Sequence, residues 1–513
     1  MKRIKYILIL IISVSLSGCS DWLDILPKNE QVTANYWKNK EDVEAMLASG
    51  YYYMRTTTRS LIVWGELRGA SIYAYGGTEE GKLQDFQLTP STSLSKWDVI
   101  YNIINIANSV IEYAPDVYEI DNTYTKEAMM SHQTEAYFMR SLMNFYLVRN
   151  FKEAPLALEP YIDDSAPFAL PKSSEEVIIA QIKDDIRTAL GTNAAKEFYD
   201  SDTWKDATKG RVTKWALYAL MADVALWSED YDLAVEYSDY LINATASRRP
   251  AFLTIPEDWF TIFNPGNSNE SIFELNWDYA GFNQTANSPS NYLKIATNSQ
   301  FQYSEAMGKR FEAEDNFLFE TNRVPVRSQW GAYVTSSEDD SDFKVYNVWK
   351  YWGTELNDIT ATRVREDANF IIYRMADVML MKAEALIWKG ESHWAEALEI
   401  INQIRRRANL DDLEVNLADT NEVEMMGFLL HERDIELAAE GKRWYDLLRF
   451  GKSKNFKYKE EFIELIIENN STANSSWIRS VLRNSNAWYL PIAQSEIEAN
   501  ELLEQNPYYA VTK

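Results

Sequence analysis

The stretch ERDIELAAEGKRWYDL, residues 432–447, says more about the fold of this 513-residue chain than any other part of it. Its charged residues Glu436, Glu440, Arg443 and Asp446 follow one another at intervals of three and four. On a helix these intervals place the side chains on one face, where acids and bases can pair. We therefore interpret the stretch as a packed, ion-paired helix and not as a catalytic pair of carboxylates.

Two segments of similar organisation lie on either side of the middle of the chain. Residues 212–227 and 370–388 predict helices that are apolar nearly all round, with alanines that allow a neighbouring helix to approach closely. Each is followed by a second helix, over residues 231–243 and 394–407, with an aromatic residue three positions before an alanine. This pattern is typical of tetratricopeptide hairpins. Because a long interval separates the two hairpins, we do not expect a continuous solenoid.

Apolar spacing also predicts helices over residues 41–55 and 132–151. The interval from about 248 to 367 differs, because it is rich in Asn, Ser, Gly, Pro and aromatic residues and has little helical periodicity. It predicts mostly long loops, with short strands at 271–276 and 343–349. Long loops on a helical scaffold are usually functional or disordered, and the aromatic content favours an ordered, functional region.

The only cysteine, Cys19, ends the run Leu16-Ser17-Gly18-Cys19. A positively charged start and an apolar stretch too short to span a bilayer precede it. The arrangement resembles a bacterial lipobox, so we expect residues 1–18 to be a lipoprotein signal peptide and Cys19 to carry diacylglycerol, with palmitate among its acyl chains. The alternative is an ordinary signal peptide with a chance cysteine.

Composition narrows the classes of partner. The chain has 77 acidic and 51 basic Lys and Arg residues, for a net charge of −26, which argues against nucleic acid and against anionic lipid surfaces. It also has 17 Trp, 31 Tyr and 21 Phe. Such a content suits proteins that stack aromatic rings on sugars, but a large core would use the same residues. Composition leaves these two explanations about even.

Three further motifs accompany the opening stretch in a fixed order. They are Tyr373–Ala385 (YRMADVMLMKAEA), the run WYLPI at 488–492 with Gln505-Asn506-Pro507-Tyr508, and, nearer the front, WGELRG at 64–69. Together they resemble the SusD/RagB-like outer-membrane lipoproteins over essentially the whole mature chain. The usual acid after the WGELRG run is missing, because Ala70 and Ser71 stand there.

The resemblance implies a mostly α fold with a tetratricopeptide-like helical-hairpin scaffold and a long loop-rich, aromatic-rich insertion. We expect one domain over residues 19–513, with scaffold at about 30–247 and 368–513 and the ligand-binding region at about 248–367. The resemblance further implies a lipid anchor on the extracellular side of the bacterial outer membrane, in polysaccharide utilisation. There the protein would capture an oligosaccharide and deliver it to a SusC-like TonB-dependent transporter.

Ligand contacts are expected where exposed Trp or Tyr rings stand beside amide, acidic or guanidinium groups that can bond sugar hydroxyls. Each such position could instead anchor its loop in a small core. The candidates are Tyr73, Tyr75, Trp277, Tyr279, Asn283, Tyr292, Arg327 and Trp330. Trp-rich loops favour a glycan, and a peptide ligand of the RagB type is the alternative.

No recognisable catalytic motif accompanies the many acids, so we expect a protein that is not an enzyme; a surface glycoside-active enzyme is the less favoured reading. No cofactor is expected. Asp339, Asp340 and Asp342 could hold a structural calcium ion, but their segment lacks the glycine and distal glutamate of an EF-hand loop. A solvated acidic loop explains them better.

Overall fold

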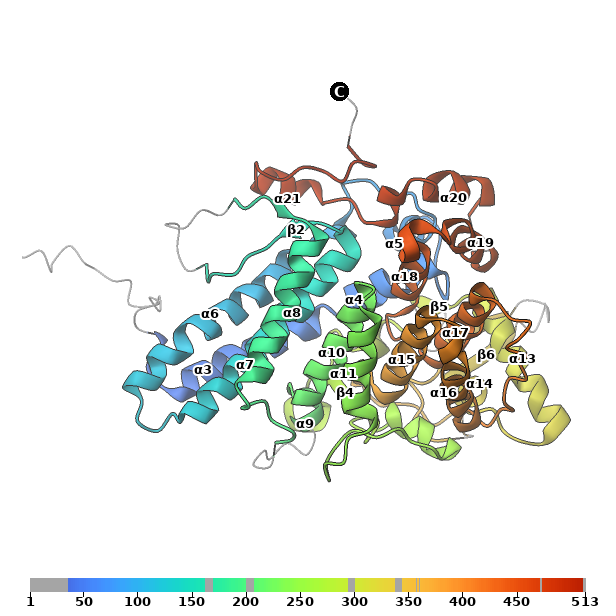
Figure 1. Ribbon diagram of the computed structural model, residues 1–513, viewed down its shortest axis with the longest axis horizontal. Helices are drawn as coiled ribbons and strands as arrows, with labels where there is room; N and C mark the ends of the chain where they lie inside the picture. The colour runs from blue at the N-terminus through green and yellow to red at the C-terminus, as the bar shows by residue number, and fades with distance from the viewer. Residues whose placement is uncertain are drawn as a thin grey trace, which may run out of the picture.

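Helices account for most of the chain described by the computed structural model, which comprises residues 36–161, 169–199, 207–293, 300–336, 344–356, 358, 360–470 and 473–510 (Figure 1). This confirms the predicted mostly α class. The α-helices of these ranges are α3 (Lys40–Thr56), α4 (Thr58–Glu66), α5 (Glu79–Gln84), α6 (Asp98–Ile120), α7 (Lys126–Phe151), α8 (Glu175–Gly191), α9 (Ala207–Gly210), α10 (Lys214–Trp227), α11 (Tyr231–Ile242), α12 (Tyr279–Phe282), α13 (Glu305–Thr321), α14 (Val326–Gly331), α15 (Met375–Lys389), α16 (Trp394–Arg407), α17 (Glu422–Glu436), α18 (Arg443–Phe456), α19 (Lys459–Asn469), α20 (Ser475–Leu482) and α21 (Gln494–Ala499).

The scaffold is a row of helices that pack side by side (Figure 1). α6 packs against α3 and α7, and α7 packs against α8. α10 and α11 form the next hairpin, and α11 packs against α15 of the hairpin that α15 makes with α16. Tyr231 of α11 stacks on Trp388 of α15, with ring centroids 6.4 Å apart. The two predicted hairpins are therefore neighbours in space, although a long interval separates them in the sequence.

Short antiparallel strands connect the middle interval to this scaffold. β4 (Ser271–Leu275) pairs with β8 (Phe370–Arg374), and β2 (Ala154–Pro155) pairs with β3 (Lys172–Ser173). A four-stranded sheet has the order β1 (Ile72–Ala74), β5 (Phe301–Tyr303), β7 (Lys344–Val348) and β6 (Ala332–Ser336). The strands predicted at 271–276 and 343–349 are confirmed as β4 and β7.

Two predictions about the middle and C-terminal segments need correction. Residues 370–374 form β8 and only then does α15 begin, because a short apolar run that is buried on both faces looks alike in a strand and in a helix. The interval 248–367 is also more regular than expected. It contains the 17-residue helix α13, whose N-cap Ser304 accepts a hydrogen bond from Met307 N, and three strands of the larger sheet.

The stretch 432–447 is not one helix. α17 ends at Glu436, a turn follows in which Ala439 and Gly441 have φ angles of 63° and 75°, and α18 begins at Arg443. The turn lets Glu436 and Glu440 reach the same partner from different elements, since both carboxylates bind Arg374 of β8.

The predicted ion pairing of this stretch is confirmed, and it is buried. Arg374 Nη1 lies 2.6 Å from Glu436 Oε1, and Arg374 Nε lies 2.8 Å from Glu440 Oε2. The three side chains are at most 2% exposed. Burial alone would raise the pKa of Glu436, but the guanidinium groups of Arg407, Arg374 and Arg327 outweigh it and lower the pKa to about 2. The carboxylate therefore stays ionised in the core.

α4 and the turn before α18 meet at backbone contact. A Cβ placed on Gly65 would lie 2.1 Å from Gly441 O, so only glycine fits there. The neighbouring Glu66 is fully buried, and its Oε1 accepts hydrogen bonds from Gly441 N at 2.6 Å and Lys442 N at 3.0 Å. Burial raises the pKa of Glu66 to about 8, although the two backbone donors act in the opposite direction. The raised pKa favours the protonated form of Glu66 at neutral pH.

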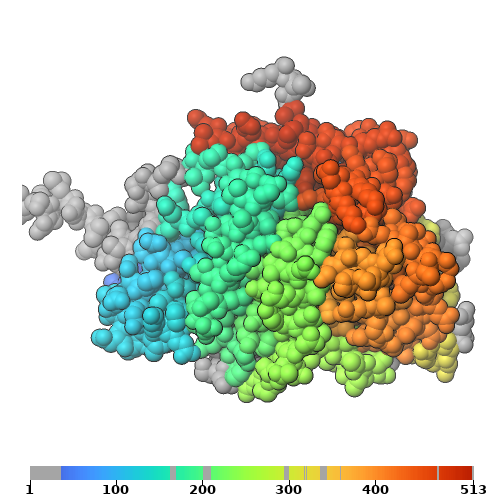
Figure 2. All heavy atoms as spheres, viewed as in Figure 1, coloured from blue at the N-terminus to red at the C-terminus, as the bar shows by residue number. Residues whose placement is uncertain are grey.

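The C-terminal residues lie across helices from both halves of the molecule (Figure 2). Arg68, just after α4, donates from Nη1 to Trp488 O at 2.7 Å and from Nη2 to Asn150 Oδ1 at 3.0 Å. Leu490 N donates to Asn150 O at 2.8 Å. These contacts fix the segment that leads from α4 into β1, which carries the first two site candidates.

Candidate functional site

Tyr73 and Tyr75 form a small aromatic platform at the edge of the four-stranded sheet. Tyr73 lies in β1 opposite Gln302 of β5, and Tyr75 follows the strand with 43% of its surface exposed. Their rings meet edge to face, with centroids 5.7 Å apart. Gln302 Nε2 donates a hydrogen bond to the Tyr75 hydroxyl at 3.1 Å. The ring of Tyr75 is thus held in place while remaining open to a ligand.

The sheet also brings Tyr292 towards this platform. Phe301 N in β5 donates to Tyr292 O, and Phe301 pairs with Ala74, the residue between the two platform tyrosines. The Tyr292 ring is half-buried, and its hydroxyl donates to Asn287 Oδ1 at 3.0 Å. Burial raises the pKa of Tyr292, and the nearby charge of Arg59 lowers it. Arg59 of α4 is therefore among the charges that act on this tyrosine.

Tyr279 and Asn283 occupy an exposed turn. Tyr279 begins the one-turn helix α12, Asp278 caps it by accepting from Gly281 N at 2.7 Å, and Asn283 ends it with a φ of 52°. The guanidinium of Arg365 lies 5.3 Å from the Tyr279 ring centroid. Both predicted residues are accessible to solvent, as a ligand contact requires.

Trp277 and Trp330 are corrections, because the prediction needed exposed rings and these side chains are only 7% and 5% exposed. Trp277 Nε1 donates to Ala286 O at 2.7 Å, within its own loop, and Trp277 N donates to Asn369 Oδ1 at 3.0 Å. Trp277 is therefore the anchor of its loop. Trp330 lies in α14, which packs against a 3₁₀ helix at Pro256–Ile262. Neither ring offers a face to a ligand.

Arg327 is also a correction. Its side chain is 1% exposed and binds the carboxylates of Glu314, Glu432 and Glu436. Three acids around one guanidinium leave no room for a ligand contact. Arg327 belongs to the buried ion network that holds α13, α14 and α17 together.

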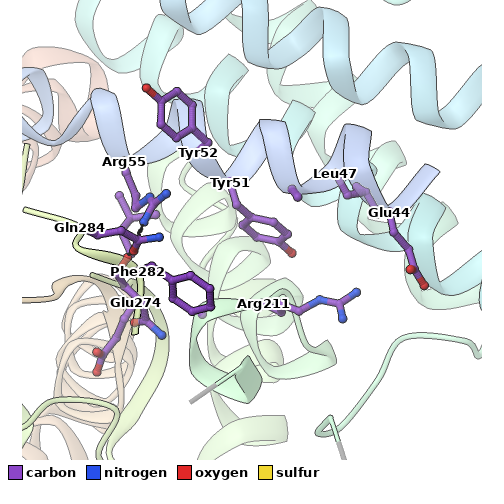
Figure 3. Close-up of a pocket in the computed structure, with 13 residues that line it drawn as sticks. Glu44, Leu47, Tyr51, Tyr52, Arg55, Arg211, Glu274, Phe282 and Gln284 are labelled. Carbon is purple, nitrogen blue, oxygen red and sulfur yellow. Dashed lines mark hydrogen bonds between the residues drawn. The ribbon is translucent and has the colours of Figure 1, made fainter. Parts of the chain in front are cut away.

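A pocket of about 550 Å³ lies where α3, the end of α9, β4 and α12 meet, and the sequence analysis missed it (Figure 3). Tyr51, Tyr52 and Arg55 of α3 form one side, and Phe282 and Gln284 form another. Sequence reasoning took α3 for a scaffold helix. The run Tyr51-Tyr52-Tyr53 was the available signal, because three successive helical residues cannot all face one core.

The inner wall of this pocket is rigid. Tyr51 donates from its hydroxyl to Glu135 Oε2 at 2.5 Å and accepts from Val212 N at 3.0 Å. Glu135, fully buried in α7, also binds Arg211 in a bidentate manner, with Nη2–Oε1 and Nε–Oε2 distances of 2.6 and 3.1 Å. Two helices, α3 and α7, and the chain before α10 are therefore joined behind the pocket.

Comparisons with known proteins indicate the family of this chain. A family model described as the SusD family matches residues 307–509, and one described as "Starch-binding associating with outer membrane" matches residues 21–226. The chain belongs to the SusD/RagB-like family. SusD-like protein P38 of Formosa agariphila is 27% identical over 496 residues, which cover 88% of this chain and 93% of the relative.

Solved structures agree on the fold of this family member. A SusD superfamily protein from Bacteroides vulgatus has a TM-score of 0.71 at 21% identity and covers 92% of this chain and 100% of its own. A structure titled "Laminarin binding SusD-like protein" has a TM-score of 0.67 at 22% identity, with the same two coverages. At such identities the likeness shows the fold.

The remaining predictions for this SusD-like chain concern the lipid anchor and the calcium site. Cys19 and the signal peptide, and likewise Asp339, Asp340 and Asp342, lie outside the described residues. Within the described ranges, no group of three or more His, Cys, Asp or Glu side chains could hold a metal ion. In the same ranges, no helix is both long and apolar enough to cross a membrane.

Proposed function

We propose that this protein is a cell-surface glycan-binding protein that captures an oligosaccharide and passes it to a SusC-like TonB-dependent transporter. The observation that carries the proposal is the platform of Tyr73 and Tyr75, which presents a fixed and exposed aromatic ring on the SusD fold. A flat apolar ring face matches the apolar face of a pyranose. Membership of a family that includes a laminarin-binding protein supports the choice of a glycan.

Capture does not need catalysis, and we propose binding without cleavage. Glu80, which follows the platform in the sequence, is paired with Arg59, and that pairing suits a structural role better than proton transfer. We also propose that Cys19 is lipidated and holds the protein at the outer face of the outer membrane. The acidic body fits this arrangement, because it would keep the rest of the molecule away from anionic lipid.

The test is a binding panel with the purified soluble protein, from Ser20 onwards. Immobilised glycans of different linkage are compared with peptide mixtures, by retention in affinity gels and by calorimetry for any hit. We expect retention on at least one glycan, with no new reducing ends released during incubation. Retention of peptides with none of any glycan would overturn the proposal in favour of a RagB-like peptide carrier. Release of reducing ends would make the protein an enzyme.

A further inference from the structure

Arg55, at the end of α3, differs from the other arginines around the pocket. Arg59 pairs with Glu80 and Arg211 pairs with Glu135. Arg55, in contrast, binds only neutral oxygens among the described residues, namely Asn276 O at 3.3 Å and Gln284 Oε1. In a chain with 77 acids and 51 basic residues, an arginine that stands beside no carboxylate is an exception that needs a reason.

The geometry leaves one edge of this guanidinium open. Both contacts of Arg55 are made by Nη1, so Nε and Nη2 have no hydrogen-bond acceptor in the described part of the chain. These two N–H groups form the fork that binds a carboxylate or a sulfate through two parallel hydrogen bonds. Gln284 Oε1 also accepts from Asp278 N at 3.2 Å, which fixes the acceptor and with it the orientation of Arg55.

The surroundings favour an anion at this edge. Arg55 is half-buried, and burial lowers its pKa, which means that the charge lacks full solvation. The pocket's carboxylates do not compensate for it. Glu274 lines the pocket, but it is fully buried and its carboxylate accepts hydrogen bonds from Asn267 N and Asn369 Nδ2 (Figure 3). Glu44 lies near the other end of α3, about three helical turns before Arg55, and its carboxylate lies 3.6 Å from Lys40 Nζ.

Two exposed aromatic rings stand at the mouth of the same pocket. Tyr52 is 55% exposed and Phe282 is 61% exposed. The Arg55 guanidinium lies 5.7 Å from the Tyr52 ring centroid. A volume of about 550 Å³ with aromatic rims and one oriented cation falls within the usual range for a small-ligand site. The rings can pack on a sugar while the guanidinium binds a charged substituent.

The chain leads from the pocket to the tyrosine platform, because α4 follows α3 and β1 follows α4. Arg55 and Arg59 are four residues apart, and only Thr57 separates α3 from α4. Arg59 pairs with Glu80 of α5, a helix that packs against β1 of the platform, while Arg55 holds Gln284. One extended ligand could therefore contact the platform with one sugar unit and the pocket with another.

We infer that the pocket binds an acidic sugar unit, so that the oligosaccharide captured by this protein is anionic. The charge is a uronate carboxylate or a sulfate ester, and it binds the Nε–Nη2 edge of Arg55. This inference rests on the proposed function, since it names the class of glycan that the same protein would capture.

The experiment uses matched pairs of oligosaccharides that differ only in charge. Oligogalacturonate and oligoalginate are compared with their carboxyl-reduced forms, and sulfated galactan and chondroitin sulfate with their desulfated forms. Calorimetry is run with the wild type, with R55Q and R55K, and with R406Q as a control, which removes an exposed arginine of α16. Circular dichroism melts show whether each variant is folded.

We expect at least one anionic oligosaccharide to bind and its neutral counterpart to bind at least tenfold more weakly. R55Q should lose about tenfold in affinity for that ligand, R55K less, and R406Q nothing. The reduced and desulfated arms tell carboxylate from sulfate. Equal binding of charged and neutral partners, or unchanged affinity in a folded R55Q, would overturn the inference while leaving glycan capture intact. Retention of no glycan in the panel would instead overturn the proposed function.

Discussion

At the scale of single residues, exposure separates the aromatic side chains that can contact a ligand from those that hold the fold. Tyr75 is 43% exposed and is oriented by Gln302, whereas Trp277 is 7% exposed and bonds its own loop. The sequence did not distinguish them, because a Trp that donates its N–H to a carbonyl of its own loop and a Trp that binds a sugar have the same sequence pattern. The two roles differ only in the folded structure, where the indole N–H of Trp277 donates to Ala286 O.

Tyr75→Ala should weaken binding of an identified glycan by about 1 kcal/mol, roughly fivefold, because one ring contact is lost. Its stability should stay within about 0.5 kcal/mol of the wild type, since the ring is on the surface. Tyr240→Ala is the matched control, because Tyr240 of α11 is 46% exposed and lies outside the platform. Calorimetry and urea melts check both. Equal effects of the two variants on affinity would remove Tyr75 from the site.

Trp277→Ala should act on stability instead. Deleting a buried indole costs about 3–5 kcal/mol through lost packing and the cavity left behind. Urea melts should therefore separate it clearly from Tyr75→Ala. Near-native stability with lost affinity would show that Trp277 contacts ligand after all.

Glu66 gives a pH dependence that can be isolated. Its pKa is about 8 in the folded protein against 4.5 for the free side chain, so the folded state keeps a proton that the unfolded state has lost. The free energy of unfolding contributed by this group is therefore fully present below pH 4.5 and falls as the pH rises towards 8. Glu66→Gln removes the titration while keeping an oxygen for the donors Gly441 N and Lys442 N.

The measurement is urea unfolding of both proteins at pH 5, 6.5 and 8. We expect Glu66→Gln to gain stability relative to the wild type as the pH rises. Other titrating groups cancel in the difference between the two profiles. Parallel profiles would contradict the raised pKa of Glu66.

At the scale of elements, periodicity predicted individual helices and strands well, but the contacts between distant elements were not predicted. The helix expected at 41–55 is α3, Lys40–Thr56, and the strand expected at 271–276 is β4. The pocket escaped prediction because its walls come from α3, β4 and α12, which no local pattern joins. Arg327 was misread for the same reason, since its partner Glu432 is 105 positions away. Local sequence patterns report the spacing of residues within one element, but they do not identify the distant element that it will contact.

The contact of α4 with the turn before α18 predicts an unusual glycine. Gly65→Ala should cost more than about 4 kcal/mol or prevent folding, because its Cβ would lie 2.1 Å from a backbone oxygen that cannot move aside alone. Gly427→Ala in α17 is the control. A Cβ there would meet nothing within 4 Å, so the helix should gain about 0.5–1 kcal/mol. Expression yield and urea melts check both, and a well-folded Gly65→Ala would contradict the close approach.

At the scale of the whole molecule, the sequence predicted the mostly α class and the family through motifs that turned out to be structural. The stretch 432–447 marks the family because its acids neutralise Arg374 and its neighbours in the core. The expected separation into scaffold and loop region is less sharp, since β4 pairs with β8 and α13 packs against α17. Such pairings depend on the complete chain, which is why composition alone made the middle interval look independent.

Cys19→Ala tests the anchor at this scale. The variant should bind glycan as the wild type does, because the proposed ligand contacts lie elsewhere in the chain, but it should leave the membrane fraction and lose surface display and uptake. Fractionation of cells, surface labelling and growth on the identified glycan measure these effects. Unchanged display at the surface would contradict lipidation at Cys19.

The hydrogen bonds from Gly441 and Lys442 to Glu66 join positions that are 375 and 376 residues apart. During synthesis, α4 exists long before the backbone that covers it. A nascent chain or a fragment that ends before Gly441 therefore has an open core at Leu61 and Trp64, with a buried acid that lacks its donors. Contacts this distant in sequence slow folding and leave apolar surface exposed meanwhile. We therefore expect that the N-terminal half does not fold as a separate domain. A premature stop in the last part of the gene should then yield an aggregating product instead of a partly active one.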